Sequence, residues 1–197
     1  MKIYDALCCV VNYQEEKDTM MCTLSKKLIE KTIDFHGHNC PGLTIGIRAA
    51  ELAGVRLDIR ESKNPVCVTE TDMCGVDAIQ FLTGCSFGKG NLIHRDYGKS
   101  AFTFFDRDKG EGFRAVFQNK VARDEDNREV RIRKLLDARL EDLFLVQEIE
   151  KEPVRPARIL TSIECGSCHE MTMESRIRLF DGQKLCLPCF NMVEQKV

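Results

Sequence analysis

Two Cys-x-x-Cys pairs near the end of the sequence constrain the fold of this chain more than any other feature. Cys165-Gly-Ser-Cys168 and Cys186-Leu-Pro-Cys189 are separated by seventeen residues, and each pair turns tightly enough for both thiolates to reach one ion. Two such pairs at this spacing are typical of a zinc site. Four thiolates complete the tetrahedron of Zn²⁺ and leave no position for water or substrate. The sequence therefore predicts a zinc ribbon with one structural zinc, held by Cys165, Cys168, Cys186 and Cys189.

The rest of this segment agrees with a ribbon. Asp181-Gly182 is a typical hairpin turn, and His169 is a spare donor that the zinc does not need. A segment this short cannot bury a core of its own, so we expect the metal to supply most of its folding energy. The proline-containing, charged stretch 150–156 reads as a linker. We therefore expect a core domain over residues 1–150 and a zinc-ribbon domain over residues 151–197.

Composition excludes several classes of protein. No apolar run approaches the roughly 20 residues of a membrane helix, and residues 1–11 lack the pattern of a signal peptide. The chain has eleven cysteines, an odd number, and four of them fall in the ribbon pairs, which favours reduced thiols and metal over disulfides. We expect a cytoplasmic protein. The net charge of −2 and the pI near 6.1 give no drive toward nucleic acid.

Periodicity predicts a mixture of helices and strands in the core. Helical patterns occupy residues 14–34, 43–53 and 76–82, and strand-like runs occupy residues 56–59, 66–69, 91–95, 100–105 and 113–117. The second helix is expected to open after Pro41-Gly42 and to stop at Gly54. Residues 124–146 carry one apolar stripe and predict a long amphipathic helix or two shorter ones. The fold class predicted for the core is α+β.

A His/Cys segment before the second helix offers metal or thiol chemistry. His36, His38 and Cys40 are two residues apart, and an extended backbone would put them on one face. Pro41 favours such a backbone at Cys40, which would also stand at a helix N-terminus, where a thiolate is stabilised. We predict Cys74 as a fourth ligand, with Cys85 as a further candidate. The alternative is that these side chains only pack or cap the helix.

Other polar residues carry weaker signals. The loop Gly84–Asn91 is rich in glycine but lacks the spacing of a phosphate-binding loop. The segment Asp96–Lys99 is either a hairpin turn alone or a loop that points Lys99 into the site. Apolar surroundings favour buried thiols for the remaining cysteines, which are Cys8, Cys9, Cys22 and Cys67.

The motifs occur in a fixed order along residues 26–117: His36–Gly42, Cys74–Gln80, Thr83–Cys85, Gly88–Asn91 and Asp96–Lys99. This series resembles the FmdE family, which takes its name from one of the subunits of formylmethanofuran dehydrogenase. The resemblance implies an α+β core, an intertwined homodimer and a second metal site around the His/Cys segment, where we predict His36, His38, Cys40 and Cys74 as ligands. Mixed imidazole and thiolate ligands suit zinc, iron or nickel.

The resemblance implies a role as subunit or accessory protein more readily than catalysis. The named enzyme contains molybdenum or tungsten, so its subunits are candidate partners. We assign cofactor binding to Asp77 and Lys99, with Asp77 as an acid for proton transfer if a catalytic metal is present. A second hypothesis is a regulator whose ribbon contacts nucleic acid or a protein. A third is thiol redox chemistry at Cys40 with Cys74 or Cys85.

Overall fold

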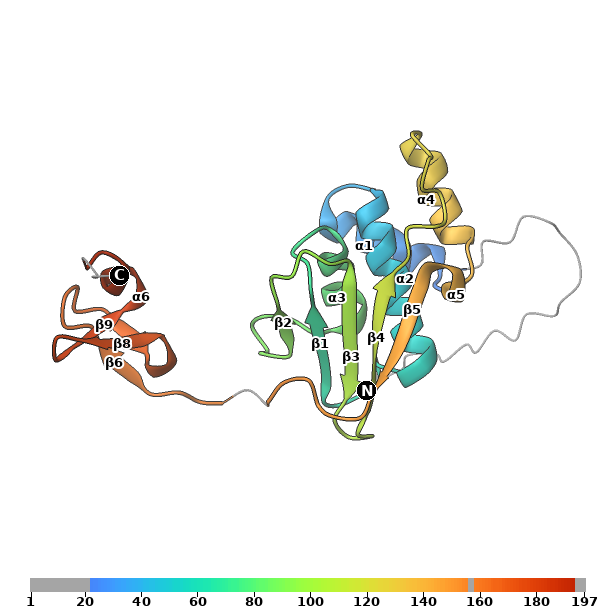
Figure 1. Ribbon diagram of the computed structural model, residues 1–197. Coiled ribbons are helices and arrows are strands. Elements are labelled where there is room, and N and C mark those ends of the chain that lie inside the picture. Colours follow the sequence, from blue (N-terminus) through green and yellow to red (C-terminus); the bar gives the residue numbers. More distant parts are fainter. Residues whose placement is uncertain (1–21, 156–157, 194–197) are drawn as a thin grey trace, which may run out of the picture. The chain divides into compact units, whose positions relative to one another are not determined.

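The computed structural model describes residues 22–155 and 158–193. The chain divides after Arg155 into two compact units, and each is described by itself (Figure 1). Cys8, Cys9 and the first part of the helix predicted over residues 14–34 lie outside the described residues. The helices among the described residues all fall short of the length and apolar character that a membrane span needs.

The first unit has five helices and five strands among its described residues. The helices are α1 (Lys26–His36), α2 (Pro41–Leu57), α3 (Gly75–Thr83), α4 (Arg128–Asp137) and α5 (Leu140–Leu143). The strands are β1 (Pro65–Thr69), β2 (Leu92–His94), β3 (Ala101–Asp106), β4 (Glu111–Phe117) and β5 (Phe144–Ile149). This mixture confirms the predicted α+β class.

The five strands form one sheet in the order β2-β1-β3-β4-β5. Strand β2 runs parallel to β1, and the other neighbours are antiparallel. The predicted hairpin of β3 and β4 is confirmed, with Phe104 opposite Phe113. The segment Asp96–Lys99 does not form a hairpin, because β1 lies between β2 and β3.

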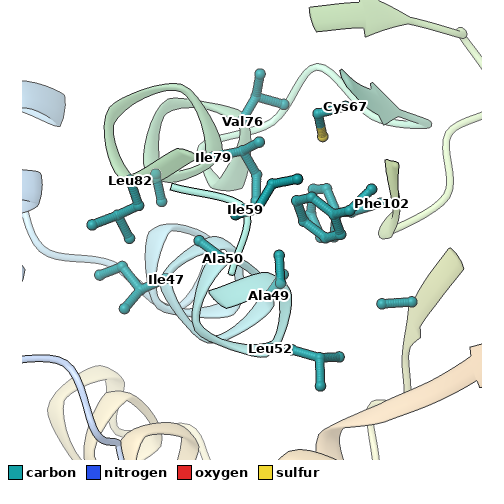
Figure 2. Packing of buried hydrophobic residues seen from close by; sticks show 14 of the residues in the cluster. Ile47, Ala49, Ala50, Leu52, Ile59, Cys67, Val76, Ile79, Leu82 and Phe102 are labelled. Atoms are coloured by element: carbon teal, nitrogen blue, oxygen red, sulfur yellow. The ribbon is translucent and has the colours of Figure 1, made fainter. Parts of the chain in front are cut away.

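Helices α1, α2 and α3 pack together, and α2 lies against β3 and β4 of the sheet (Figure 1). Figure 2 shows how the core fills the space between α2, α3 and the strands, with Ile59, Ile79 and Phe102 pointing toward one another. These three side chains are at most 1% exposed. Cys67 on β1 belongs to the same cluster, and Cys22 is 7% exposed, so the prediction of buried thiols is confirmed for both.

A close backbone contact between α2 and α3 fixes where these helices cross. A Cβ atom on Gly46 would lie 2.2 Å from the carbonyl oxygen of Gly75 and 2.6 Å from its Cα. No side chain can occupy that space, so the two backbones touch there. This close approach brings the N-terminus of α3 beside the N-terminal half of α2.

A buried ion pair ties two other segments to α2. Arg48 and Glu51 are 1% and 2% exposed, and Arg48 Nη1 lies 2.8 Å from Glu51 Oε2. Arg48 also donates to the carbonyl oxygens of Leu136 and Ala138, at the C-terminal end of α4. Glu51 accepts hydrogen bonds from the N–H and the hydroxyl of Thr23. Removal of either partner would leave a buried charge unpaired.

The first two helices differ from the predicted bounds. Helix α1 starts at Lys26, because the side chain of Ser25 caps it by accepting from the N–H of Leu28. Helix α2 continues through Gly54 and ends at Leu57, where the cap residue Asp58 adopts φ 51° and ψ 44°. The strand predicted over residues 56–59 is therefore wrong. Leu57 and Ile59 are buried against the core, which favours continuation of the helix and a turn after it.

The prediction over residues 124–146 is correct only for its first part. Helix α4 starts after Asn127, whose side chain accepts from two backbone N–H groups, and α5 is a single turn. From Phe144 the chain is a strand, because β5 pairs with β4 along its whole length. The apolar residues at 143–146 fit a helical stripe, and the strand follows from the pairing.

The described residues of the second unit form two small hairpins, a 3₁₀ turn and a short helix. Its elements are β6 (Ser162–Glu164), β7 (Met171–Met173), the 3₁₀ turn η1 (Glu174–Arg176), β8 (Ile177–Phe180), β9 (Gln183–Cys186) and α6 (Leu187–Asn191). The predicted turn at Asp181-Gly182 joins β8 to β9, and both residues have positive φ, as a two-residue hairpin requires. The unit is a zinc ribbon in form.

Candidate metal centres

The structure brings four predicted ligands of the core together. One donor atom from each of His36, His38, Cys40 and Cys74 lies within 4.8 Å of the others. His36 is the last residue of α1, Cys40 precedes α2, and Cys74 precedes α3. The cluster therefore lies where the end of one helix meets the starts of two others.

The backbone reaches this arrangement by a tight turn. Gly37 ends α1 with φ 90°, a conformation that favours glycine, and His38 follows in the connection to α2. The three side chains therefore do not share the face of an extended strand, as the two-residue spacing suggested. The rings of His36 and His38 nevertheless meet, with centroids 4.4 Å apart. Arg128 of α4 holds this turn by donating to the carbonyl oxygen of Asn39.

Cys40 has the extended backbone that the following proline favours, with φ −152° and ψ 159°. Its sulfur accepts a hydrogen bond from the N–H of Leu43, 3.3 Å away, and so caps α2. The capping alternative and the ligand hypothesis are compatible, because a thiolate has further lone pairs. Burial, followed by the hydrogen bond and charge of Cys40, raises the pKa of Cys74 above its ordinary value.

His36 has different partners at its two ring nitrogens. Nδ1 lies 2.7 Å from Oδ2 of Asp77, and Nε2 lies 3.9 Å from Cys40 Sγ. Gln80 donates to the other oxygen of Asp77 over 3.5 Å. Asp77 was expected to bind a cofactor or to transfer protons; the structure places it against a histidine of the cluster. The spacing of 41 residues between these partners gives no signal in the sequence.

The chemistry and spacing of the core cluster fit a metal ion. Nitrogen and sulfur ligands about 2.0–2.3 Å from a tetrahedral ion are roughly 3.3–3.8 Å apart, which is close to the observed separation of Cys40 Sγ and His36 Nε2. A Cβ on Gly42 would lie 3.8 Å from Cys74 Sγ and 4.0 Å from Cys40 Sγ. The absence of a side chain there keeps the space beside both sulfurs open.

The other candidates lie outside this cluster. Cys85 is fully buried near Cys67, and the part of the chain that the structure describes does not place it among the four donors. Lys99 is exposed, 6.0 Å above the ring of Tyr97. In the loop Gly84–Asn91, Lys89 donates to the carbonyl oxygen of Gly84, and Asn91 bonds to both Ser86 and Pro65. These contacts stabilise the loop itself.

The ribbon contains the second group of four. One donor atom of each predicted cysteine, Cys165, Cys168, Cys186 and Cys189, lies within 4.8 Å of the others. Two of the sulfurs, of Cys168 and Cys186, are 3.8 Å apart, the separation that tetrahedral zinc gives two thiolates. His169 is turned to Glu164, 2.9 Å away. The geometry matches a closed structural site.

Electrostatics of the ribbon favour a bound cation. Hydrogen bonds from backbone N–H groups, first that of Cys186, lower the pKa of Cys165 to about 6. At Cys168 a backbone hydrogen bond from Glu170 acts to lower the pKa, but burial and the neighbouring thiols outweigh it and raise the pKa to about 12. Four thiolates this close repel one another, so all four ionise together only around a positive ion.

Comparisons with known proteins agree with both halves of the chain. A family model described as "FmdE, Molybdenum formylmethanofuran dehydrogenase operon" matches residues 35–154, and the model of the prokaryotic dksA/traR C4-type zinc finger matches residues 158–195. The second match supports zinc as the metal of the ribbon.

Two individual proteins are similar to this chain. A curated protein of Archaeoglobus fulgidus, described as a probable S-adenosyl-L-methionine-binding protein, is 28% identical in an alignment 196 residues long, in which 83% of this chain is covered. The chain spans about half of that relative, 52% of its length. The crystal structure of a tungsten formylmethanofuran dehydrogenase FmdE-like protein from Syntrophus aciditrophicus has a TM-score of 0.64 at 25% identity. That match covers 83% of this chain and 90% of the other.

Proposed function

The chain belongs to the FmdE family, whose model matches more than half of it, and from this premise we propose that it is a metal-binding accessory protein or subunit of a one-carbon redox enzyme. Its core would bind one transition metal through His36, His38, Cys40 and Cys74, and its ribbon would bind one structural zinc. The observation that carries the proposal is the convergence of those four donors from three helix ends.

Ligand chemistry indicates the class of the core metal, a transition metal, and does not select one member of it. Two imidazoles and two thiolates suit zinc, iron and nickel alike. Such an ion supplies Lewis acidity, or redox chemistry in the case of iron or nickel. The chain's own contribution is to hold the donors: Gly37 turns His38 toward His36, and Leu43 and Gly46 fix Cys40 and Cys74 on packed helices.

We propose a homodimer and a molybdenum or tungsten dehydrogenase as partners. Several large apolar side chains of the core unit are more than half exposed, namely Phe35, Met73, Phe87, Tyr97 and Leu145, and apolar residues of this kind are enriched at protein interfaces. Sedimentation equilibrium of the full chain tests the homodimer by measuring its mass. A mass of one chain over the micromolar range would contradict the homodimer.

We also propose a cytoplasmic location. The nine cysteines of the described residues are all free thiols, which persist in a reducing compartment. Fractionation of the native host, with the protein followed by antibody, tests the location. Recovery from the cell envelope or from the medium would contradict it.

The metal content per chain tests the proposal. Elemental analysis of protein purified without chelator should find two metals in the intact chain and one in the variant His38→Ala/Cys40→Ala. A matched control, His169→Ala/Cys85→Ala, also removes one histidine and one cysteine, but both lie outside the two groups of donors, so it should keep two metals. One zinc in all three proteins would refute the core metal site.

A second candidate function is a regulator that uses its ribbon as an interaction module. The match to a dksA/traR zinc finger favours it, as do four exposed apolar side chains of the ribbon, Met171, Met173, Leu179 and Met192, each at least 51% exposed. Seven basic and seven acidic residues balance over residues 150–197, so we expect a protein partner in preference to nucleic acid. Fluorescence anisotropy with duplex DNA should show no salt-sensitive binding.

A further inference from the structure

The two ring nitrogens of His36 face different groups, one a carboxylate and the other a thiol. Nδ1 is 2.7 Å from an oxygen of Asp77, and a carboxylate has no hydrogen to donate. The hydrogen of the neutral ring therefore stands on Nδ1 and is donated to Asp77. Nε2 is left with its lone pair, 3.9 Å from Cys40 Sγ, on the side of the cluster.

We infer that Asp77 is a positioning residue of the core metal site: its carboxylate holds the ring and the tautomer of His36 so that Nε2 is the metal donor. The inference rests on the proposed function and names which atom of His36 binds. Carboxylate–histidine–metal arrangements of this kind raise the basicity of the ligand and fix its direction.

Asp77 is itself held in place. It lies in the first turn of α3, where a negative charge interacts favourably with the helix dipole. Its backbone N–H reaches the carbonyl oxygen of Cys74 over 3.2 Å, and Gln80 donates to its free oxygen. Helix α3 therefore supplies one ligand, Cys74, and also orients another ligand that belongs to α1.

We expect Asp77 to contribute more to metal binding than to the stability of the fold. The His36 side chain is 9% exposed, but that of Asp77 is 39% exposed, and partly exposed ion pairs add little to stability. The contact between α1 and α3 also has an apolar component, since the rings of Phe35 and Phe81 are 5.5 Å apart. We therefore expect the two helices to stay packed when the carboxylate is removed.

The test measures metal affinity of the full chain for Asp77→Ala and Asp77→Asn. Core sites are titrated with Co²⁺ and Zn²⁺ against a competing chelator. Asp77→Ala should lower the affinity of the core site roughly 10- to 100-fold. Asp77→Asn keeps an oxygen acceptor without the charge. The metal affinity of its core site should lie between those of Asp77→Ala and the unchanged protein. The ribbon zinc should be unaffected in both.

Three comparisons distinguish positioning from a structural role. The control Asp72→Ala removes an exposed carboxylate two residues before Cys74 and should leave the affinity unchanged. In a His36→Ala background, Asp77→Ala should have no further effect, because the ring that it orients is gone. The melting temperature of the metal-free protein should fall by no more than about 4 °C with Asp77→Ala, the size of one lost interaction with the helix dipole.

The outcomes separate this inference from the proposed function. If Asp77→Ala binds as tightly as the unchanged protein while His38→Ala/Cys40→Ala does not bind, Asp77 does not position His36 and the metal site stands. If Asp77→Ala lowers the metal-free melting temperature by more than about 4 °C along with the affinity, its role is structural and the inference is overturned. If the unchanged core takes up no metal, the proposed function fails first.

Discussion

The substitution Gly46→Ala tests the helix contact on which the proposed core metal site depends. A Cβ at Gly46 would lie 2.2 Å from the carbonyl oxygen of Gly75 and 2.7 Å from its carbonyl carbon. The obstacle is backbone, so no rotamer change relieves it. The methyl group has room only if α2 and α3 separate by about 1 Å, and separation of that size breaks the close packing of both helices.

Two effects of opposite sign decide the magnitude. Overpacking of this kind costs about 1–3 kcal/mol, and more where backbone must move. Alanine favours a helix interior over glycine by about 1 kcal/mol. Because the clash is with backbone, the overpacking cost should lie at the upper end of its range. We expect a net loss of about 2 kcal/mol in the free energy of unfolding. In a unit of this size that is a fall of roughly 4–8 °C in melting temperature.

Gly54→Ala is the matched control, on the same helix. No atom lies within 4 Å of the position of its added Cβ, so only the helix preference acts. We expect a gain of about 0.5–1 kcal/mol. Unfolding is followed by circular dichroism at 222 nm, since the chain has no tryptophan. A Gly46→Ala protein as stable as Gly54→Ala would refute the described crossing of α2 and α3.

Three further predictions concern the ribbon, the buried ion pair and pH. Cys189→Ser should lower the zinc content by one per chain and expose the ribbon to limited proteolysis, with the helical signal at 222 nm retained; retention of zinc would contradict the ligand set. Arg48→Met or Glu51→Gln alone should cost about 3–5 kcal/mol in urea denaturation, because each leaves a buried charge unpaired; a loss below about 1 kcal/mol would contradict the burial. Arg114 donates two hydrogen bonds to Glu70 and lowers the pKa of that carboxyl. The stabilisation is therefore present above the ordinary carboxyl pKa of about 4.3 and is lost as pH falls through the lowered value. The difference in melting temperature between the unchanged protein and Arg114→Met should shrink from pH 7 to pH 3, and a constant difference would contradict the pairing.

The ribbon could be predicted from sequence because its determinants are local. Each Cys-x-x-Cys pair and the Asp181-Gly182 turn set the backbone within a few residues, and zinc requires the pairs to meet. The core cluster was found through the chemistry of its side chains, but its geometry was not. The two-residue spacing suggested a strand, whereas the end of α1 at Gly37 and the start of α2 at Pro41 make a turn.

The features that sequence missed depend on distant partners. Strand β5 exists because residues 144–149 pair with β4, and its apolar residues fit a helical period equally well. Helix α2 passes Gly54 because Leu57 is buried in the core; tertiary packing overrides the weak preference of glycine to end a helix. The pairing of His36 with Asp77 arises only when α1 and α3 pack together.

Anomalous X-ray diffraction on crystals of the full chain, grown without chelator and measured at the zinc, iron and nickel edges, tests the central claim most directly. We expect two peaks per chain. One should be a zinc among Cys165, Cys168, Cys186 and Cys189, and the other a transition metal among His36, His38, Cys40 and Cys74, bonded to Nε2 of His36. A single zinc peak in the ribbon, with the core thiols and imidazoles bound to no metal, would contradict the claim.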